Sequence, residues 1–471
     1  MPRLFLLTAS RLALVAVVAG LACGRPAAAQ SAAPPGADDT AAGADAAAID
    51  PTAPARPLTT AGGYPALRPA LDGGLNSVVR PMQSALAPAR PALPLRSGPA
   101  EDPEQPQGLR AGNFLLLPSI HAGGGATTNA AGTARGEGSG FLTTDGELLL
   151  RHEGDITRTD LSLKGSYTGY LDGDTESDPT FSAAATSRVD LTETDRVDLG
   201  LGYSFAREEA SSAETGGSSE RPAVEVFSAD VGYTRSAGLI GLALKGSTDR
   251  TAYGRAEGTN SSDRTNTAFA GTLRLSYDTG AIVSPFVEGG GFGRVMDRAR
   301  DAEGYRRSSL GWELKGGLAV TGETLTGEIA VGYAREEFDD ARLAAMDGLV
   351  VDGSLAYAAS ELTTIGLDVA TSFSPTRLAG ASGFVTTSAD ASLTHELFET
   401  VELSLGGGVG RDDYAGLSRS VTTYTVRAGL DWRLRRDLTF TLDASHAYTD
   451  SSVAGDDSRE SRIEAGLTYR P

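Results

Sequence analysis

The stretch RVDLGLGYSF, residues 196–205, decides the fold class. Apolar or aromatic residues occupy every second position, and charged, polar or small residues fill the positions between them. Successive side chains of an extended strand point to opposite faces, so this period of two predicts a β-strand with one apolar face. The pattern returns at residues 424–434 and 437–448, and in similar short segments from about residue 112 to the C-terminus. A soluble β-sandwich alternates in the same way, so the period alone does not choose between sandwich and barrel.

The first 29 residues predict export from the cytoplasm. Arg3 and an apolar run precede Ala27-Ala28-Ala29, an A-x-A cleavage site typical of a secretory signal peptide. A lipoprotein signal at residues 20–23 is the alternative, but its first residue is Gly and the A-x-A site lies downstream. Cleavage after Ala29 removes Cys23, the only cysteine, so the mature chain would have neither a disulfide nor thiol chemistry.

Two features favour a barrel in a membrane. No apolar stretch of about 18 residues follows the signal, so the sequence predicts no spanning helix. Tight turns also alternate with longer polar loops, which is the asymmetry of outer-membrane barrels between the periplasmic and external sides. The turns are residues 193–195, 321–323, 360–361 and 435–436, and the loops are residues 209–221, 254–264 and 297–306.

The expected fold is all-β, a single transmembrane antiparallel up-and-down barrel over residues 108–471. Counting segments gives about 18 strands, with 16 as the alternative, and an even number leaves both ends on the periplasmic side. The first segment, residues 112–127, is the weakest because it contains Pro118 and three consecutive glycines.

Residues 30–107 have a different composition from the rest of the chain. They hold 14 of the 22 prolines, among many alanines and almost no aromatic residues. Such a segment cannot bury enough apolar surface to offset its ordering entropy, so we expect a disordered periplasmic linker or tail. The whole chain is 40% hydrophobic with a mean hydropathy of −0.16, which suits strands that meet lipid at every second residue. The net charge of −20 argues against a nucleic-acid partner.

Aromatic residues are expected to form two girdles at the membrane interfaces. Five tyrosines are placed near the long-loop ends of rising strands and one tryptophan near a short-turn end, with cross-strand packing in a soluble sheet as the alternative. These residues are Tyr203, Tyr233, Tyr333, Tyr414, Tyr448 and Trp432.

Alternation also predicts which charged residues line the lumen. They would support a solute path, or they would form ion pairs that fill a polar interior. The candidates are Asp198, Glu313, Lys315, Glu328, Glu402, Arg427, Asp431, Arg433, Asp443 and Glu464, with Arg470 in addition.

The sequence predicts no catalytic, cofactor-binding or metal-binding residues. It has four histidines, and His446 adjoins Ser445, but alternation places these two side chains on opposite faces. The acidic loop 172–178 lacks the glycine and the distal glutamate of a calcium-binding loop. No enzyme activity is therefore expected.

The stretch GLRAGNFLLLP, residues 108–118, follows a Pro-rich approach and resembles the entry motif of the outer-membrane β-barrel porin family of α-proteobacteria called barrel porin type 2. The resemblance extends over residues 103–471 and implies an outer-membrane barrel of undefined substrate, with polysaccharide export suggested by analogy. It departs at the glycine run 123–125, where family members often carry an acidic stretch, and at the C-terminus, where Tyr469 stands near the position of the terminal aromatic that the insertion machinery reads.

The expected function is porin-like: passive passage of small solutes or export of a polymer across the Gram-negative outer membrane, without a cofactor. The alternative is a closed structural or surface-interaction barrel, and a periplasmic β-sandwich is a distant third. Expected partners are outer-membrane lipid and lipopolysaccharide, the barrel-insertion machinery and an envelope or polysaccharide component.

Overall fold

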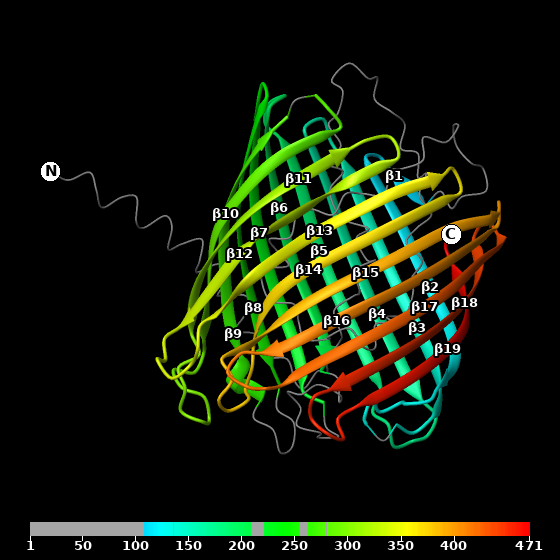
Figure 1. Cartoon of the computed structure of the whole chain (residues 1–471). Coiled ribbons are helices and arrows are strands. Elements are labelled where there is room, and N and C mark those ends of the chain that lie inside the picture. Colours follow the sequence, from blue (N-terminus) through cyan, green and yellow to red (C-terminus); the bar gives the residue numbers. More distant parts are fainter. Residues whose placement is uncertain (1–107, 135, 209–220, 255–260, 279) are drawn as a thin grey trace.

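The computed structural model describes residues 108–134, 136–208, 221–254, 261–278 and 280–471. The expected signal peptide and the expected linker lie outside the described residues. Within them, one antiparallel sheet contains 19 strands and closes on itself as a barrel (Figure 1). The strands are β1 (Leu109–Ala111), β2 (Phe114–Thr127), β3 (Ser139–Glu153), β4 (Thr157–Tyr170), β5 (Asp178–Asp190), β6 (Asp195–Arg207), β7 (Ala223–Ala237), β8 (Ile240–Tyr253), β9 (Asn266–Tyr277), β10 (Val283–Met296), β11 (Ser309–Thr321), β12 (Leu325–Phe338), β13 (Met346–Ser360), β14 (Thr363–Pro375), β15 (Gly383–Phe398), β16 (Val401–Tyr414), β17 (Ser420–Arg435), β18 (Leu438–Ser451) and β19 (Ser458–Tyr469).

Strands β2 to β19 form the barrel in sequence order, each paired with the next. The barrel closes where β19 pairs with β2, from Arg462 opposite Thr127 to Tyr469 opposite Ile120. The prediction of an up-and-down barrel with 18 strands is confirmed. No helix in these ranges is both long and apolar enough to span a membrane.

The connections confirm the predicted asymmetry. Those that follow even-numbered strands are five to fifteen residues long, and those that follow odd-numbered barrel strands are two to five. Both β2 and β19 have their free ends on the short-turn side.

Strand β2 forms despite its proline, because Pro118 lies at a break in the neighbouring ladder. The short strand β1 pairs with β2 up to Leu116, and β19 pairs with β2 only from Ile120 onward. The backbone groups of even-numbered β2 residues point toward this edge, as the bond from the Thr128 N–H to the Ser461 carbonyl shows. A residue without an N–H therefore removes no ladder bond here.

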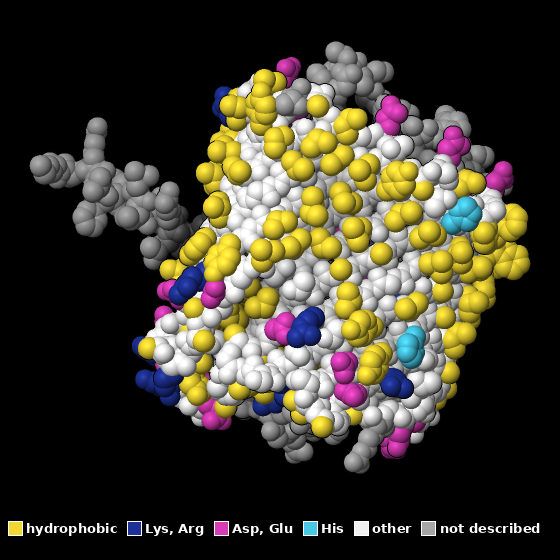
Figure 2. Space-filling model, viewed as in Figure 1, with side chains coloured by type: hydrophobic (Ala, Val, Ile, Leu, Met, Phe, Trp, Pro, Cys, Tyr) yellow, Lys and Arg dark blue, Asp and Glu magenta, His cyan; other side chains and the backbone are white. Residues whose placement is uncertain are grey.

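The outer face of the barrel is apolar and the inner face is polar. In β6, Leu199 and Leu201 are 45% and 63% exposed, whereas Asp198 and Gly200 occupy the inward positions. Figure 2 shows hydrophobic side chains spread across the wall, with charged side chains concentrated near its edges. This distribution is the reverse of that in a water-soluble protein, and it suits a wall surrounded by lipid.

The ladder between β13 and β14 is incomplete. Pairing starts beside the tight turn and stops at Gly353 opposite Val369. Beyond this point, Met346 to Asp352 pair only with β12, and Ala370 to Pro375 pair only with β15. The sheet is therefore split between these two strands in its long-loop half.

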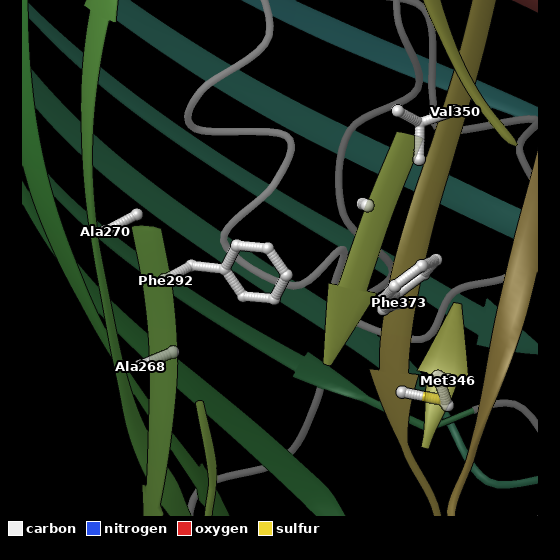
Figure 3. Close-up of a cluster of buried hydrophobic side chains, with 7 residues drawn as sticks. Ala268, Ala270, Phe292, Met346, Val350 and Phe373 are labelled. Carbon is white, nitrogen blue, oxygen red and sulfur yellow. The ribbon is translucent and has the colours of Figure 1, made fainter. Parts of the chain in front are cut away.

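At the split, two parts of the sheet overlap. Phe373 lies an even number of residues from the lipid-facing Leu367 and so shares the outward face of β14, yet it is only 1% exposed. Its ring contacts that of Phe292, which shares the inward face of β10 with Glu288, at a centroid distance of 6.5 Å. The outer face of β14 thus packs on the inner face of β9 to β13 (Figure 3). This overlap cluster consists of Ala268, Ala270, Phe292, Ala334, Met346, Val350 and Phe373.

Candidate functional site

The inner wall of β10, β11 and β13 carries a lysine surrounded by carboxylates. The Nζ atom of Lys315 lies 3.0 Å from Asp352 Oδ2, 3.2 Å from Glu288 Oε1 and 3.3 Å from Glu313 Oε1. Alternation brings these groups together: 313 and 315 are successive inward positions of β11, and Lys315 lies opposite Glu288 in the ladder. All four side chains are at least nine-tenths buried.

Arginine 274 on β9 extends this network. Its guanidinium donates to Glu288 Oε2 at 2.9 Å and to both oxygens of Glu328 on β12 at 2.9 and 3.0 Å. The guanidinium also stacks on the ring of Phe286 at 3.9 Å, which fixes its plane. Two cations thus stand against four carboxylates, so the network has a formal charge of −2 when all six groups are ionised.

A second polar cluster lies on the inner wall where β19 closes on β2 and β3. His121 shares a hydrogen bond of 2.9 Å with Thr468, and its Nε2 lies 3.5 Å from Glu464, which also accepts from Arg462 at 3.1 Å. Asp145 is opposite His121 in the ladder and 3% exposed. Neither of its carboxylate oxygens accepts a hydrogen bond of ordinary length from the described residues.

Glycine makes room for this second cluster. A Cβ on Gly466 would lie 2.3 Å from His121 Cε1, and one on Gly123 would lie 2.8 Å from His121 Nε2. The imidazole therefore lies flat against the wall between two positions without side chains. This contact explains why a glycine at position 123, in the glycine run within β2, is compatible with the barrel.

The lumen residues predicted from alternation fall at inward positions of their strands. Glu313, Lys315 and Glu328 belong to the first network, and Glu464 belongs to the second. Asp198 binds Arg188 at 3.2 Å on a separate part of the wall. Five further residues lie together on β16 to β18, where Glu402 is opposite Asp431, with Arg427, Arg433 and Asp443 at further inward positions. Arg470 directly follows the last residue of β19.

Sequence analysis missed Arg274, Glu288 and Asp352, which complete the first network. Each occupies an inward position of an alternating strand. The same alternation, applied to residues 266–277, 283–296 and 346–360, would have identified them.

Four of the six predicted girdle aromatics lie on the outer face at the predicted ends. Tyr203 contacts Phe227 at a ring-centroid distance of 4.7 Å, and Tyr448 stacks on Tyr424 at 6.4 Å. Tyr333 lies beside Trp312 on the long-loop half, and Trp432 is exposed near a short turn.

Two girdle predictions were wrong. Tyr414 is 6% exposed and packs inward on Phe384, because it shares the face of β16 that carries Asp412. Tyr233 faces outward but lies at the short-turn end, because β7 descends toward the turn after Ala237. Its hydroxyl donates to Asp195 at 2.5 Å, at the start of β6.

His446, the histidine that adjoins Ser445 in the sequence, lies on the outer face of β18. His446 bonds Ser461 through Nδ1 at 2.8 Å on the outer face, and no carboxylate orients its ring among the described residues. In the described ranges, no group of three or more His, Cys, Asp or Glu side chains could hold a metal ion.

A closed barrel with a lipid-facing exterior and a charged interior defines a porin-type β-barrel of the Gram-negative outer membrane. The sequence matches the family described as "Putative beta-barrel porin 2" over residues 102–471, and the chain belongs to this family. No curated protein matches the sequence.

Several solved structures are similar to this chain at low sequence identity. OccK2 (OpdF) from Pseudomonas aeruginosa is 12% identical, with 75% of this chain and 97% of that chain covered and a TM-score of 0.41. The siderophore receptor PirA from the same organism is 9% identical, with 75% and 80% covered and a TM-score of 0.38. The FrpB iron transporter from Neisseria meningitidis (F5-1 variant) is 9% identical, with 73% and 64% covered and a TM-score of 0.41.

Proposed function

We propose that this protein is a passive channel for small hydrophilic solutes and that it favours cations. The observation that carries the proposal is the carboxylate excess around Lys315 and Arg274 on the inner wall. Fixed charge of one sign beside a water path raises the local concentration of counter-ions. Asp145, on the part of the wall where the barrel closes, adds a further carboxylate on the inner face.

The test is ion selectivity in a planar bilayer. We expect the wild-type protein in a tenfold KCl gradient to give a reversal potential of the sign that indicates K⁺ preference. Glu313→Gln should shift this potential toward zero because it removes one carboxylate of the network. Glu361→Gln, in the exposed turn between β13 and β14, is the matched control and should leave the potential unchanged.

A closed barrel is the competing proposal, and one observation favours it. Glu288, Glu313 and Lys315 are each no more than 5% exposed, so these charges satisfy one another rather than facing open water. Full-length protein and a variant lacking residues 31–107 should then both be silent in the bilayer, with folding confirmed by heat-dependent gel mobility. Conductance in the truncated variant alone would instead identify the segment as an obstruction.

Export of a polymer through the same lumen is the remaining use of the barrel. An envelope polysaccharide would be the partner, and lipopolysaccharide would contact the outer face above the aromatic residues. Tyr469 and Leu467 face outward on the last strand and would present the C-terminal signal to the insertion machinery.

A further inference from the structure

At the split between β13 and β14, side-chain contacts replace the backbone hydrogen bonds that join neighbouring strands elsewhere in the barrel wall. Odd-numbered β14 residues turn their backbone groups toward β13, but beyond Val369 no β13 residue pairs with them. The N–H of Val351 instead donates to the side-chain hydroxyl of Thr371 at 3.1 Å. The carbonyl of Phe373 accepts from the Arg294 guanidinium at 3.3 Å, across the overlap. Side chains thus satisfy groups that elsewhere join neighbouring strands.

The overlap cluster supplies the remaining contact between the two parts of the sheet. Its side chains are alanine, valine, methionine and phenylalanine, so the two faces meet through apolar packing. Such packing has little directional preference, whereas a backbone ladder fixes both register and spacing. The two faces can therefore separate by losing packing and a few side-chain bonds, without unpairing a complete ladder.

The split lies at the height of the outer aromatic residues. Leu349 on β13 is opposite Tyr333 in the ladder and is 67% exposed on the outer face. Trp312 packs beside Tyr333 on the next strand. Aromatic residues of this kind mark the lipid–water interface, and the long-loop end is the external side. One end of the overlap thus adjoins the outer leaflet.

The other end of the overlap is polar and faces the lumen. Arg294 binds Glu336 at 3.2 Å, and the hydroxyl of Ser309 donates to the same carboxylate at 2.5 Å. A path from the outside of the wall to its inside therefore meets three environments in turn. These are the lipid-facing side chain of Leu349, the apolar overlap cluster and the charged Arg294 on the inner face. This order matches a molecule with one acyl chain and a polar head.

We propose that the overlap between β14 and the inner face of β9 to β13 is a lateral passage for single-chain amphiphiles between the lumen and the outer leaflet. The passage is closed in this structure because every side chain of the overlap cluster is less than 9% exposed. It opens when β14 and β15 move away from β10 and β13. The acyl chain then replaces Phe373 against Phe292, and the head group moves along Arg294.

A disulfide across the split tests the passage. Val351→Cys with Thr371→Cys joins the two strands just beyond the end of their ladder, where the Val351 backbone N–H already donates to the Thr371 hydroxyl. The expected mature chain has no other cysteine. Leu367→Cys with Ala391→Cys, across the intact ladder of β14 and β15, is the matched control. Phe373→Ala, which loosens the overlap without a cross-link, is the complementary variant.

The probe is a fluorescently labelled lysophosphatidylglycerol added to the outside of proteoliposomes. Albumin, which is too large for the lumen, then extracts the probe that has not crossed. We expect vesicles with wild-type protein to protect more probe from albumin than protein-free vesicles. Oxidation of the 351–371 cysteine pair should lower this transfer at least tenfold, and reduction of the disulfide should restore it. The control disulfide should have no effect, and Phe373→Ala should raise transfer. Equal transfer by the oxidised and reduced 351–371 pair, or no transfer by wild-type protein, would overturn the proposal.

Conductance separates this proposal from the proposed channel function. The variant with the oxidised 351–371 disulfide should conduct ions like wild-type protein, because the disulfide joins two strands of the wall and leaves the lumen unchanged. A conducting wild-type channel whose probe transfer is the same with the 351–371 disulfide oxidised or reduced would support the channel and overturn the lateral passage.

Discussion

Replacing Lys315 with methionine should destabilise the barrel more than any single carboxylate substitution in the same network. Methionine has a similar length and no charge, so the change removes the ammonium and largely keeps the volume. The three carboxylates within 3.3 Å of Nζ then lose a shared partner, and among the residues that the structure describes only Glu288 has a second cation, Arg274. Breaking a buried ion pair by removing one partner costs about 3–5 kcal/mol. Because two of these carboxylates lose the cation outright, we expect the upper part of that range.

Removing a carboxylate instead of the lysine separates the effect of charge balance on stability from the effect of packing. Glu313→Gln removes one carboxylate from a network that has two in excess, and it leaves Lys315 bound to Glu288 and Asp352. We expect this substitution to change the free energy of unfolding by less than about 1 kcal/mol, since relief of repulsion offsets the lost contact. Lys315→Arg, which keeps the charge, should lower the free energy of unfolding by an amount between those of Lys315→Met and Glu313→Gln.

The assay is guanidinium unfolding of the protein in lipid vesicles, followed by tryptophan fluorescence and extrapolated linearly. The chain has two tryptophans, and Trp312 adjoins Glu313 on β11, so the signal reports on this part of the wall. If Lys315→Met unfolds within about 1 kcal/mol of wild type, or if Glu313→Gln costs as much as Lys315→Met, the carboxylates do not depend on this lysine and the reasoning fails.

Two further predictions concern the second cluster and an external loop. Gly466→Ala should cost about 1–3 kcal/mol because its Cβ would collide with His121, and His121→Ala in the same chain should recover most of that loss in the unfolding assay. In the loop 339–345, hydrogen bonds from the Arg342 side chain and from the Arg306 N–H hold the pKa of Asp340 well below its usual 3.8. A lowered pKa stabilises the folded loop at pH values above about 4 and loses this effect as the pH falls toward the folded value. Hydrogen exchange of the loop should therefore increase on acidification relative to Asp340→Asn, and parallel profiles would contradict the assignment.

Much of the barrel could be predicted because its pattern is local. Alternation within each strand gave the strands, their number and the inward positions of residues such as Glu313 and Glu464. The girdle prediction for Tyr414 contradicted this alternation, because even-numbered residues of β16 such as Glu402 and Asp412 face inward and Tyr414 shares their face. The prediction failed for Tyr233 because the height of a residue depends on whether its strand rises or descends.

The overlap could not be predicted because it depends on contacts between distant strands. Nothing in the sequence of β14 indicates that Phe373 leaves the lipid-facing side, since its alternation continues unchanged from Leu367. Phe292 likewise follows the alternation of β10. Only the end of the ladder at Gly353 brings these two faces together, and that end is a property of the closed sheet.

The closure of β19 on β2 also determines the order in which the barrel can be assembled. The Ser461 N–H donates to the Thr128 hydroxyl 333 residues earlier in the chain, so β19 completes the free edge of β2 only after all the strands between them have been synthesised. Until then β2 presents an open edge, of which β1 covers only the part up to Leu116. Loss of the final strand would therefore leave two unpaired edges in lipid, so a C-terminal truncation should abolish the barrel rather than shorten it.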